Sequence, residues 1–333
     1  MLSKTVLLKR SFQFRFISTS IATQPIETKP ILDISTNVHT NDEIESKDDK
    51  KFITHSMYPH PGYSKESCQN IFFSHREPRT LGDKIAFSLT YGTRRLFDFI
   101  TGYKDLSSDD VFQHANTRWY MTESKWLSRI IVLESVASCP GAVASFLRHL
   151  HSVRLLKRDK AFIETLQEEA YNERMHLLTF IKIGTPSWFT RLAIYIGQGI
   201  FTNLFFISYL ISPKNCHRFV GYLEEEAVRT YSHLLHELNV PGRLSKFENL
   251  KIPTIAYQYW NELNPNSSFK DLIMVVRADE AKHREVNHTF ANLQKNDRNP
   301  FSGLHIENFD KPQPSLKLDN TRPTGWERKD LYL

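Results

Sequence analysis

Two short stretches of the chain pair a carboxylate with an imidazole three residues apart: Glu173 with His176, and Glu280 with His283. On an α-helix this spacing puts both side chains on one face, one turn apart. Two such helices, together with one inward-pointing glutamate from each of two further helices, provide the ligands of carboxylate-bridged di-iron bundles. The pattern therefore indicates oxygen chemistry at a pair of metal ions, provided that two further glutamates are available.

A third copy of the motif, Glu285 with His288, shows that the spacing alone is a weak signal. Glu280 and His283 interrupt a helical face that is otherwise mainly apolar, where a buried charge needs a partner. Glu285 and His288 instead share their face with alanines and an asparagine. We therefore assign Glu280 and His283 to the metal site, and we expect the third copy to lie on a less buried side of the helix.

The remaining two carboxylates are chosen by their neighbours. Glu134 is the single acid in a run of apolar residues. Three consecutive acids, Glu224, Glu225 and Glu226, offer the other candidate. Glu224 has mostly apolar helical neighbours, whereas Glu225 and Glu226 each lie within one turn of Arg229 and suit solvated ion pairs. We therefore choose Glu134 and Glu224.

The chemistry of this ligand set favours iron. Four glutamates carry four negative charges, which two Fe²⁺ ions offset, and four carboxylates in one core repel one another strongly without cations. Carboxylates with imidazole and no thiolate suit iron or manganese rather than a zinc thiolate site. For a single motif, surface ion pairs or core histidines would be the better explanation. The order of acids and histidines along four helices favours a metal pair.

The elements that must position these residues are long helices. Hydrophobic periodicity and stop signals predict six of them, over residues 83–100, 124–156, 159–183, 188–211, 215–238 and 269–293. We predict an all-α fold, a ferritin-like four-helix bundle that houses the di-iron site, with two additional amphipathic helices that associate with a membrane. The expected regions are a transit peptide at 1–24, a flexible N-terminal arm at 25–75, the metal-binding domain at 76–293 and an irregular tail at 294–333.

The two extra helices, 83–100 and 188–211, are the candidates for membrane contact. The second is long enough to span a bilayer, since about twenty apolar residues suffice. It also contains Arg191, Gln198 and Asn203. We expect both helices to lie in one leaflet as a monotopic anchor, with a transmembrane span as the alternative.

The charge distribution points to a targeting leader rather than to nucleic acid. The net charge is +6, but Lys4, Lys9, Arg10 and Arg15 lie within the first twenty residues, which contain no acid. Such a leader is typical of mitochondrial transit peptides, with a disordered basic tail as the alternative. We expect no nucleic-acid partner. The three cysteines are widely spaced and form no C-x-x-C pair, so neither a disulfide framework nor a zinc knuckle is indicated.

Four sequence blocks resemble the signature blocks of the mitochondrial alternative oxidases: 133–137, 172–177, 223–227 and 277–283. The similarity extends over about residues 75–292. The resemblance implies a cyanide-resistant ubiquinol oxidase that reduces O₂ to water at two iron ions and pumps no protons, bypassing the cytochrome part of the respiratory chain. It also implies a homodimer on the matrix face of the mitochondrial inner membrane.

The resemblance assigns residues to roles. The iron positions of the family fall on Glu134, Glu173, His176, Glu224, Glu280 and His283. Its redox or hydrogen-bonding tyrosine falls on Tyr231, for which core packing is the alternative. Its quinol-pocket positions fall on Arg94, Asp98, Arg129, Leu133 and Thr230, and less firmly on Cys139. Arg129 could orient a quinol oxygen or form a structural salt bridge with Asp98. Asn172 and Asp279 each precede an iron-helix glutamate and fit an outer shell.

Two other classes of protein share parts of this pattern. A di-iron hydroxylase or desaturase would insert oxygen into a lipid, and a ferritin-like protein would bind iron without oxidising quinol. The apolar stretch 188–211 argues against a soluble iron store. Cys68 does not sit in the sequence context of the regulatory cysteine of plant alternative oxidases, so the chain looks more like the fungal branch.

Overall fold

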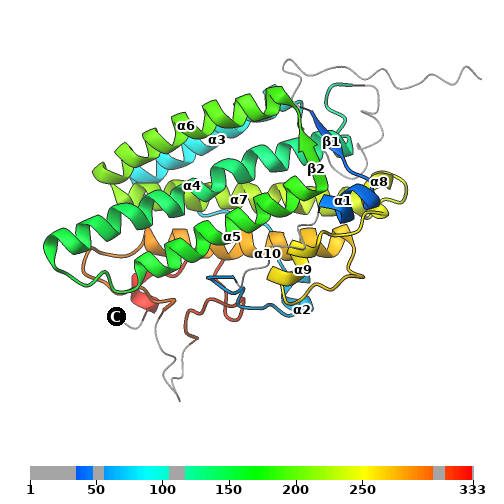
Figure 1. Ribbon diagram of the computed structural model, residues 1–333. Helices are drawn as coiled ribbons and strands as arrows, with labels where there is room; N and C mark the ends of the chain where they lie inside the picture. Colours follow the sequence, from blue (N-terminus) through cyan, green and yellow to red (C-terminus); the bar gives the residue numbers. More distant parts are fainter. Residues whose placement is uncertain (1–34, 48–55, 105–116, 303–311, 332–333) are drawn as a thin grey trace, which may run out of the picture.

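The computed structural model describes residues 35–47, 56–104, 117–302 and 312–331. The described chain is mostly helical, which confirms the predicted all-α fold. Its core is a bundle of four long helices (Figure 1): α4 (Glu123–Leu155), α5 (Phe162–Ile183), α7 (Pro213–Leu238) and α10 (Phe269–Phe290). The closest helix pairs are α4 with α5 and α7 with α10. Each helix agrees with a predicted one to within a few residues at either end.

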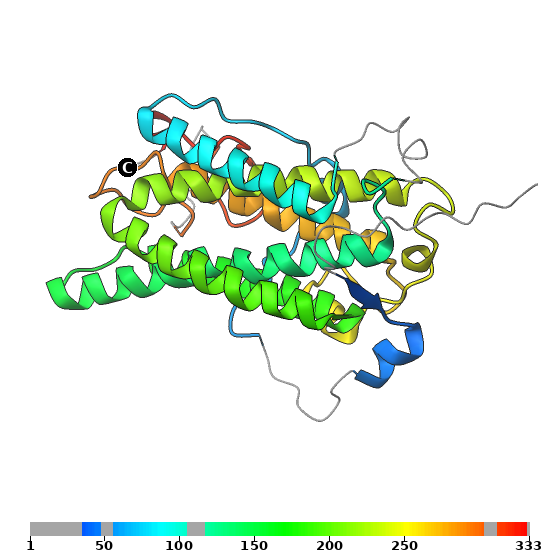
Figure 2. The ribbon, with the colours of Figure 1, turned by 90° about the horizontal axis from the view of Figure 1, so that it is seen from above.

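Two further helices cover one side of the bundle. Helix α3 (Leu81–Thr101) packs on α7, and α6 (Trp188–Ile211) packs on α4. Figures 1 and 2 show both helices along the same face of the bundle. Both helices turn large apolar side chains outward. Within the described ranges, two helices are long and apolar enough to cross a membrane, but the most apolar window of α4 is 56% buried in the bundle and that of α6 only 11%. Helix α6 therefore leaves most of its apolar surface uncovered.

Local sequence signals fix where the helices begin and end. Helix α10 starts with a capping box, in which Ser268 and Asp271 satisfy each other's backbone N–H groups. Helix α3 has the same device at its start. It ends at Gly102, whose left-handed backbone (φ 67°) suits glycine. Ser212 ends α6 and also caps α7, where Pro213 occupies the first turn.

Shorter elements tie the ends of the bundle together. Strands β1 (Thr36–Val38) and β2 (Gly184–Pro186) pair antiparallel, with Thr36 opposite Pro186. The remaining elements are α1 (Asn41–Lys47), α2 (Lys65–Gln69), α8 (Ser245–Glu248), α9 (Thr254–Tyr259) and the 3₁₀ helix η2 (Arg328–Asp330). The predicted transit peptide lies outside the described residues. Much of the predicted flexible arm that is described packs on the bundle, where it buries His60 and Cys68.

The expected exposure of three polar residues on the metal-binding helices α7 and α10 was wrong. Glu285 and His288 are buried rather than exposed, and so is Glu225, which was expected to form solvated ion pairs. His288 Nε2 donates to Glu225 Oε1 (2.8 Å) while an Arg218 guanidinium N–H donates to His288 Nδ1 (2.9 Å). The physical reason is that the C-terminal tail covers this side of α10, where Trp326 Nε1 donates to Glu285 Oε1 (2.7 Å).

Candidate metal centre

The six predicted metal ligands converge in the middle of the bundle. Their side chains form two groups, each with ligand atoms within 4.8 Å of one another: Glu134, Glu173, His176 and Glu280, and Glu173, Glu224, Glu280 and His283. Both groups contain Glu173 and Glu280. Two overlapping sets that share two carboxylates are what a pair of bridged metal ions requires.

Several donor atoms of these residues lack well-formed hydrogen bonds within the protein, as expected for the ligands of a metal ion. Among the described residues, neither carboxylate oxygen of Glu173 has a hydrogen bond of good geometry, nor has Nδ1 of His283. His283 Nδ1 nevertheless lies 2.6 Å from Glu173 Oε1. Buried charged groups without partners are strongly unfavourable unless they are paired or bind a metal. The donor atoms present therefore fit two metal ions.

The electrostatics of the site lead to the same conclusion. Burial, reinforced by the charges of Glu280 and Glu173, raises the pKa of Glu134 to about 8. Burial and the same two neighbours raise the pKa of Glu224 well above its ordinary value. Burial would also raise the pKa of Glu173, but His283 and His176 lower it. These acids can all be ionised together only if cations replace the protons.

Asp279 fixes the orientation of His176. Nε2 of His176 lies 3.1 Å from Asp279 Oδ2, while Nδ1 faces Glu134 Oε2 at 3.2 Å and Glu280 Oε1 at 3.3 Å. Asp279 is acceptor-only when ionised, so Nε2 of His176 carries a hydrogen, and Nδ1 is the ring nitrogen that would be available to a metal ion. Asn172 Nδ2 also donates to Asp279 Oδ2 (3.0 Å). Both residues therefore lie in the outer shell that the sequence predicts.

Two further donors to Asp279 were not predicted as site residues. Trp260 Nε1 donates to Asp279 Oδ2 (2.9 Å). His60 Nε2 lies 2.8 Å from Asp279 Oδ1, and the Gly62 backbone N–H donates to the other ring nitrogen of His60. His60 comes from the predicted flexible arm, where its only signal is a histidine between two prolines in an aromatic stretch.

Tyr231 reaches the metal site as predicted. Its buried hydroxyl donates to Glu134 Oε1. Burial, then the charges of Glu134 and Glu280, raise the pKa of the phenol well above its ordinary value. The hydroxyl therefore stays protonated and holds one carboxylate of the site in place.

A mainly apolar cavity of about 240 Å³ connects the metal site with α3 and α6. Four of the predicted quinol-pocket residues line it, namely Arg94, Arg129, Leu133 and Thr230. Three of the predicted metal ligands and Tyr231 also line it. Cys139 is not among the lining residues. We call this space the apolar cavity.

Asp98 does not line the apolar cavity but holds its two arginines. Arg129 Nη2 lies 2.5 Å from Asp98 Oδ1, and Arg94 Nε lies 2.7 Å from Asp98 Oδ2. Arg94 also pairs with Glu226 (2.8 Å). The Arg129–Asp98 salt bridge, one of the two alternatives that the sequence leaves open for Arg129, is therefore present, and it sets both guanidinium groups at the wall of the cavity.

A helical bundle that brings buried glutamates and histidines together beside an apolar cavity is typical of di-iron proteins that react with oxygen. The pattern of the alternative oxidase family matches residues 63–292. The chain belongs to the alternative oxidase family.

Individual members of the family are similar over most of their length. The chain is 62% identical over 304 residues to mitochondrial alternative oxidase 2 of Candida albicans, covering 91% of this chain and 83% of that protein. It is 53% identical over 338 residues to the mitochondrial alternative oxidase of Wickerhamomyces anomalus, covering 99% and 98%. The family confirms the predicted enzyme class, a ubiquinol oxidase, and does not favour a hydroxylase or an iron store.

Proposed function

We propose that this chain oxidises ubiquinol and reduces O₂ to water at two iron ions held by Glu134, Glu173, His176, Glu224, Glu280 and His283. The observation that supports this most strongly is the pair of overlapping ligand groups that share Glu173 and Glu280. When bound, the two iron ions would accept electrons from quinol and pass them to O₂. The bundle keeps bulk water away from these residues, since all six are buried.

The apolar cavity is the proposed quinol site. Leu133 and its apolar neighbours fit the ring, while Arg129 and Arg94 offer N–H donors to a quinol oxygen. Their pairing with Asp98 orients both guanidinium groups before the substrate arrives, which lowers the entropy cost of binding.

Tyr231 and Glu134 provide a route for protons out of the apolar cavity. Both residues line the cavity, and the Tyr231 hydroxyl donates to Glu134 Oε1. A quinol hydroxyl placed at this wall would lie close to the Glu134 carboxylate and the Tyr231 hydroxyl. We infer that the quinol proton leaves along this wall and that Tyr231 keeps the Glu134 carboxylate oriented toward the metal site.

The outward apolar faces of α3 and α6 suit a membrane surface. Ile85 and Leu96 on α3 and Ile200 and Leu204 on α6 are exposed. Both helices border the apolar cavity, so a lipid-dissolved quinol could enter without crossing water. We propose that the protein lies as a homodimer on the matrix face of the mitochondrial inner membrane, after removal of a leader near residues 1–24.

Oxygen uptake by purified protein with a short-chain ubiquinol, in the presence of cyanide, tests the function. We expect cyanide-insensitive uptake with water as the product. The Glu173→Ala variant should lose uptake and bound iron, whereas Glu164→Ala, an exposed acid on the same helix, should keep both. Incorporation of ¹⁸O from ¹⁸O₂ into an organic product, or iron binding without quinol-dependent uptake, would contradict the proposal.

A further inference from the structure

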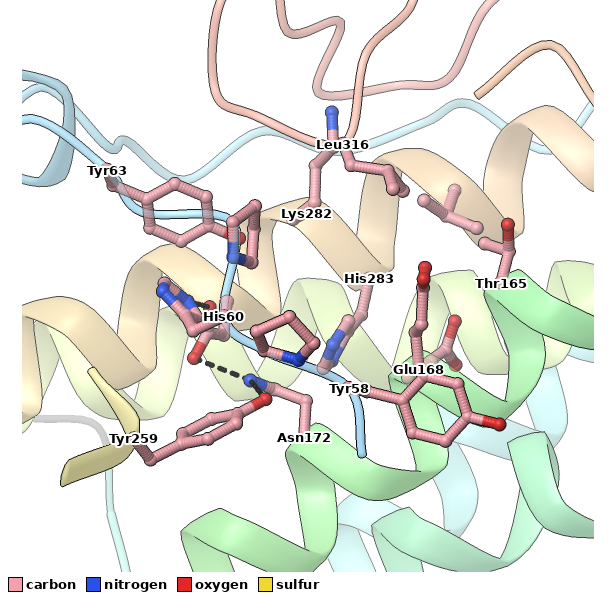
Figure 3. A pocket seen from close by; sticks show the side chains of 15 residues that line it. Tyr58, His60, Tyr63, Thr165, Glu168, Asn172, Tyr259, Lys282, His283 and Leu316 are labelled. Carbon is pink, nitrogen blue, oxygen red and sulfur yellow. Dashed lines mark hydrogen bonds and ion pairs between the residues drawn. The ribbon is translucent and has the colours of Figure 1, made fainter. Parts of the chain in front are cut away.

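A second, smaller cavity reaches the metal site from another direction. It has a volume of about 90 Å³, and its lining combines polar residues of α5 and α10, among them Asn172 and His283 (Figure 3), with aromatic and apolar residues of the N-terminal segment, α9, α10 and the C-terminal tail. Among the described residues, it shares no lining residue with the apolar cavity. Helix α9, which contributes Tyr259 to it, lies on the side of the bundle opposite α3 and α6 (Figure 1). We call it the polar cavity.

The polar cavity has the size and chemistry of a water site. At about 30 Å³ per molecule it has room for roughly three waters. Oδ1 of Asn172 is buried at its wall and has no hydrogen-bond partner among the described residues. Glu169 is buried there too, and both of its oxygens accept from the same Asn287 amide (2.9 and 3.0 Å), which leaves acceptor capacity unused. Buried acceptors of this kind are usually satisfied by ordered water.

The outer wall of the polar cavity is held in a fixed shape. Pro59 and Pro61 restrict the backbone on either side of His60, which is bound to Asp279 (2.8 Å). The Tyr58 hydroxyl donates to Gln167 on α5 (2.7 Å). The cavity is therefore preformed, and Leu316 of the C-terminal tail also lines it.

We propose that the polar cavity is the path by which product water leaves the metal site. This inference rests on the proposed oxidase function. Reduction of one O₂ by two quinols gives two quinones and two waters, all formed at one buried site. The apolar cavity is then filled by quinone, and its wall offers few polar groups to water. The polar cavity ends at His283 on the other side, so water can leave while quinone still occupies the quinol site.

Two substitutions from different elements should obstruct this path. Leu316→Trp adds bulk to the wall of the cavity at a half-buried position, where a larger side chain can be accommodated. Glu169→Leu replaces the main polar group of the wall by an apolar side chain of similar size. The matched controls are Ser315→Trp, next to Leu316 and outside the lining, and Glu164→Leu on the exposed side of α5.

The direct measurement is the entry of solvent deuterons into the resting, iron-loaded protein without turnover. The protein is mixed with D₂O, frozen at set times and reduced by one electron in the frozen state. Deuterons near the iron pair are then counted by electron–nuclear double resonance. We expect Leu316→Trp and Glu169→Leu to slow deuteron entry by about tenfold or more, and both controls to match the wild type. Turnover should fall in the same two variants with an unchanged KM for quinol.

The outcomes separate this inference from the function itself. Wild-type protein without iron or quinol-dependent oxygen uptake would refute the proposed function. Wild-type protein that turns over, together with folded Leu316→Trp and Glu169→Leu proteins that admit deuterons at the wild-type rate, would overturn the water path alone. Circular dichroism and the melting temperature identify a variant that fails to fold. If either Leu316→Trp or Glu169→Leu does not fold, the rate of deuteron entry in the other variant tests the water path.

Discussion

Replacing Asp279 by asparagine tests how the metal ligands are held in place. Asp279 accepts hydrogen bonds from four donors: His60, Asn172, His176 and Trp260, at 2.8–3.1 Å. Asparagine has the same shape but only one acceptor oxygen. If that oxygen takes the place of Oδ2, the amide nitrogen meets the N–H of His60. If the amide is reversed, three donors lose their acceptor instead.

The expected size of the effect follows from these contacts. Losing a buried hydrogen bond to a charged acceptor costs about 1.5–3 kcal/mol. Changes to residues that orient metal ligands typically weaken metal binding by about 10–100-fold, and this range corresponds to about 1.4–2.7 kcal/mol. The two estimates agree. We therefore expect Asp279→Asn to raise the dissociation constant for Fe²⁺ by about 10–100-fold.

An anaerobic titration with buffered Fe²⁺ measures this constant. Asp271→Asn is the matched control, because Asp271 lies on the same helix but belongs to its capping box. That control should lose about 1 kcal/mol of stability at most and bind iron as the wild type does. An Asp279→Asn protein with wild-type iron affinity would refute the role assigned to this carboxylate.

Other predictions concern single contacts. Tyr231→Phe should keep its iron but lose oxygen uptake by about 100-fold or more, because Glu134 loses its donor; iron analysis and uptake on one sample check this. Arg129→Leu should raise the KM for quinol by about tenfold, the loss of one charged hydrogen bond, with unchanged iron content. His288→Ala removes a buried ring together with its hydrogen bonds to Glu225 and Arg218, and it should lower the free energy of unfolding in urea by about 3 kcal/mol. Although burial raises the pKa of Asp83, the Thr80 N–H and a guanidinium hold it below its usual value. Its contribution to stability is therefore present above about pH 4 and lost in more acidic solution, so urea unfolding of Asp83→Asn should depend less on pH below that point.

The helices and the metal ligands could be predicted because both depend on local periodicity. The Glu-x-x-His spacing and the apolar face around it identify Glu173 and Glu280 without any knowledge of the tertiary structure. Strong stop signals such as Ser212 and Pro213 fixed the end of α6. Glu134 was found in the same way, as the single acid on an apolar stretch.

What could not be predicted depends on segments without periodicity. His60 reaches Asp279 across 219 positions of sequence, from a loop whose path no local pattern describes. Glu285 and His288 are buried because an irregular C-terminal tail crosses them, with Trp326 bound to Glu285. On an isolated helix their neighbours would leave them exposed, so only the tertiary structure shows that they are covered.

X-ray diffraction from crystals of the iron-loaded protein, recorded at the iron absorption edge, tests the central claim most directly. The account predicts two anomalous peaks per chain, both among Glu134, Glu173, Glu224, Glu280 and the two histidines, with Glu173 and Glu280 contacting both. A single peak, or peaks elsewhere in the bundle with these carboxylates bound only to protein groups, would contradict it.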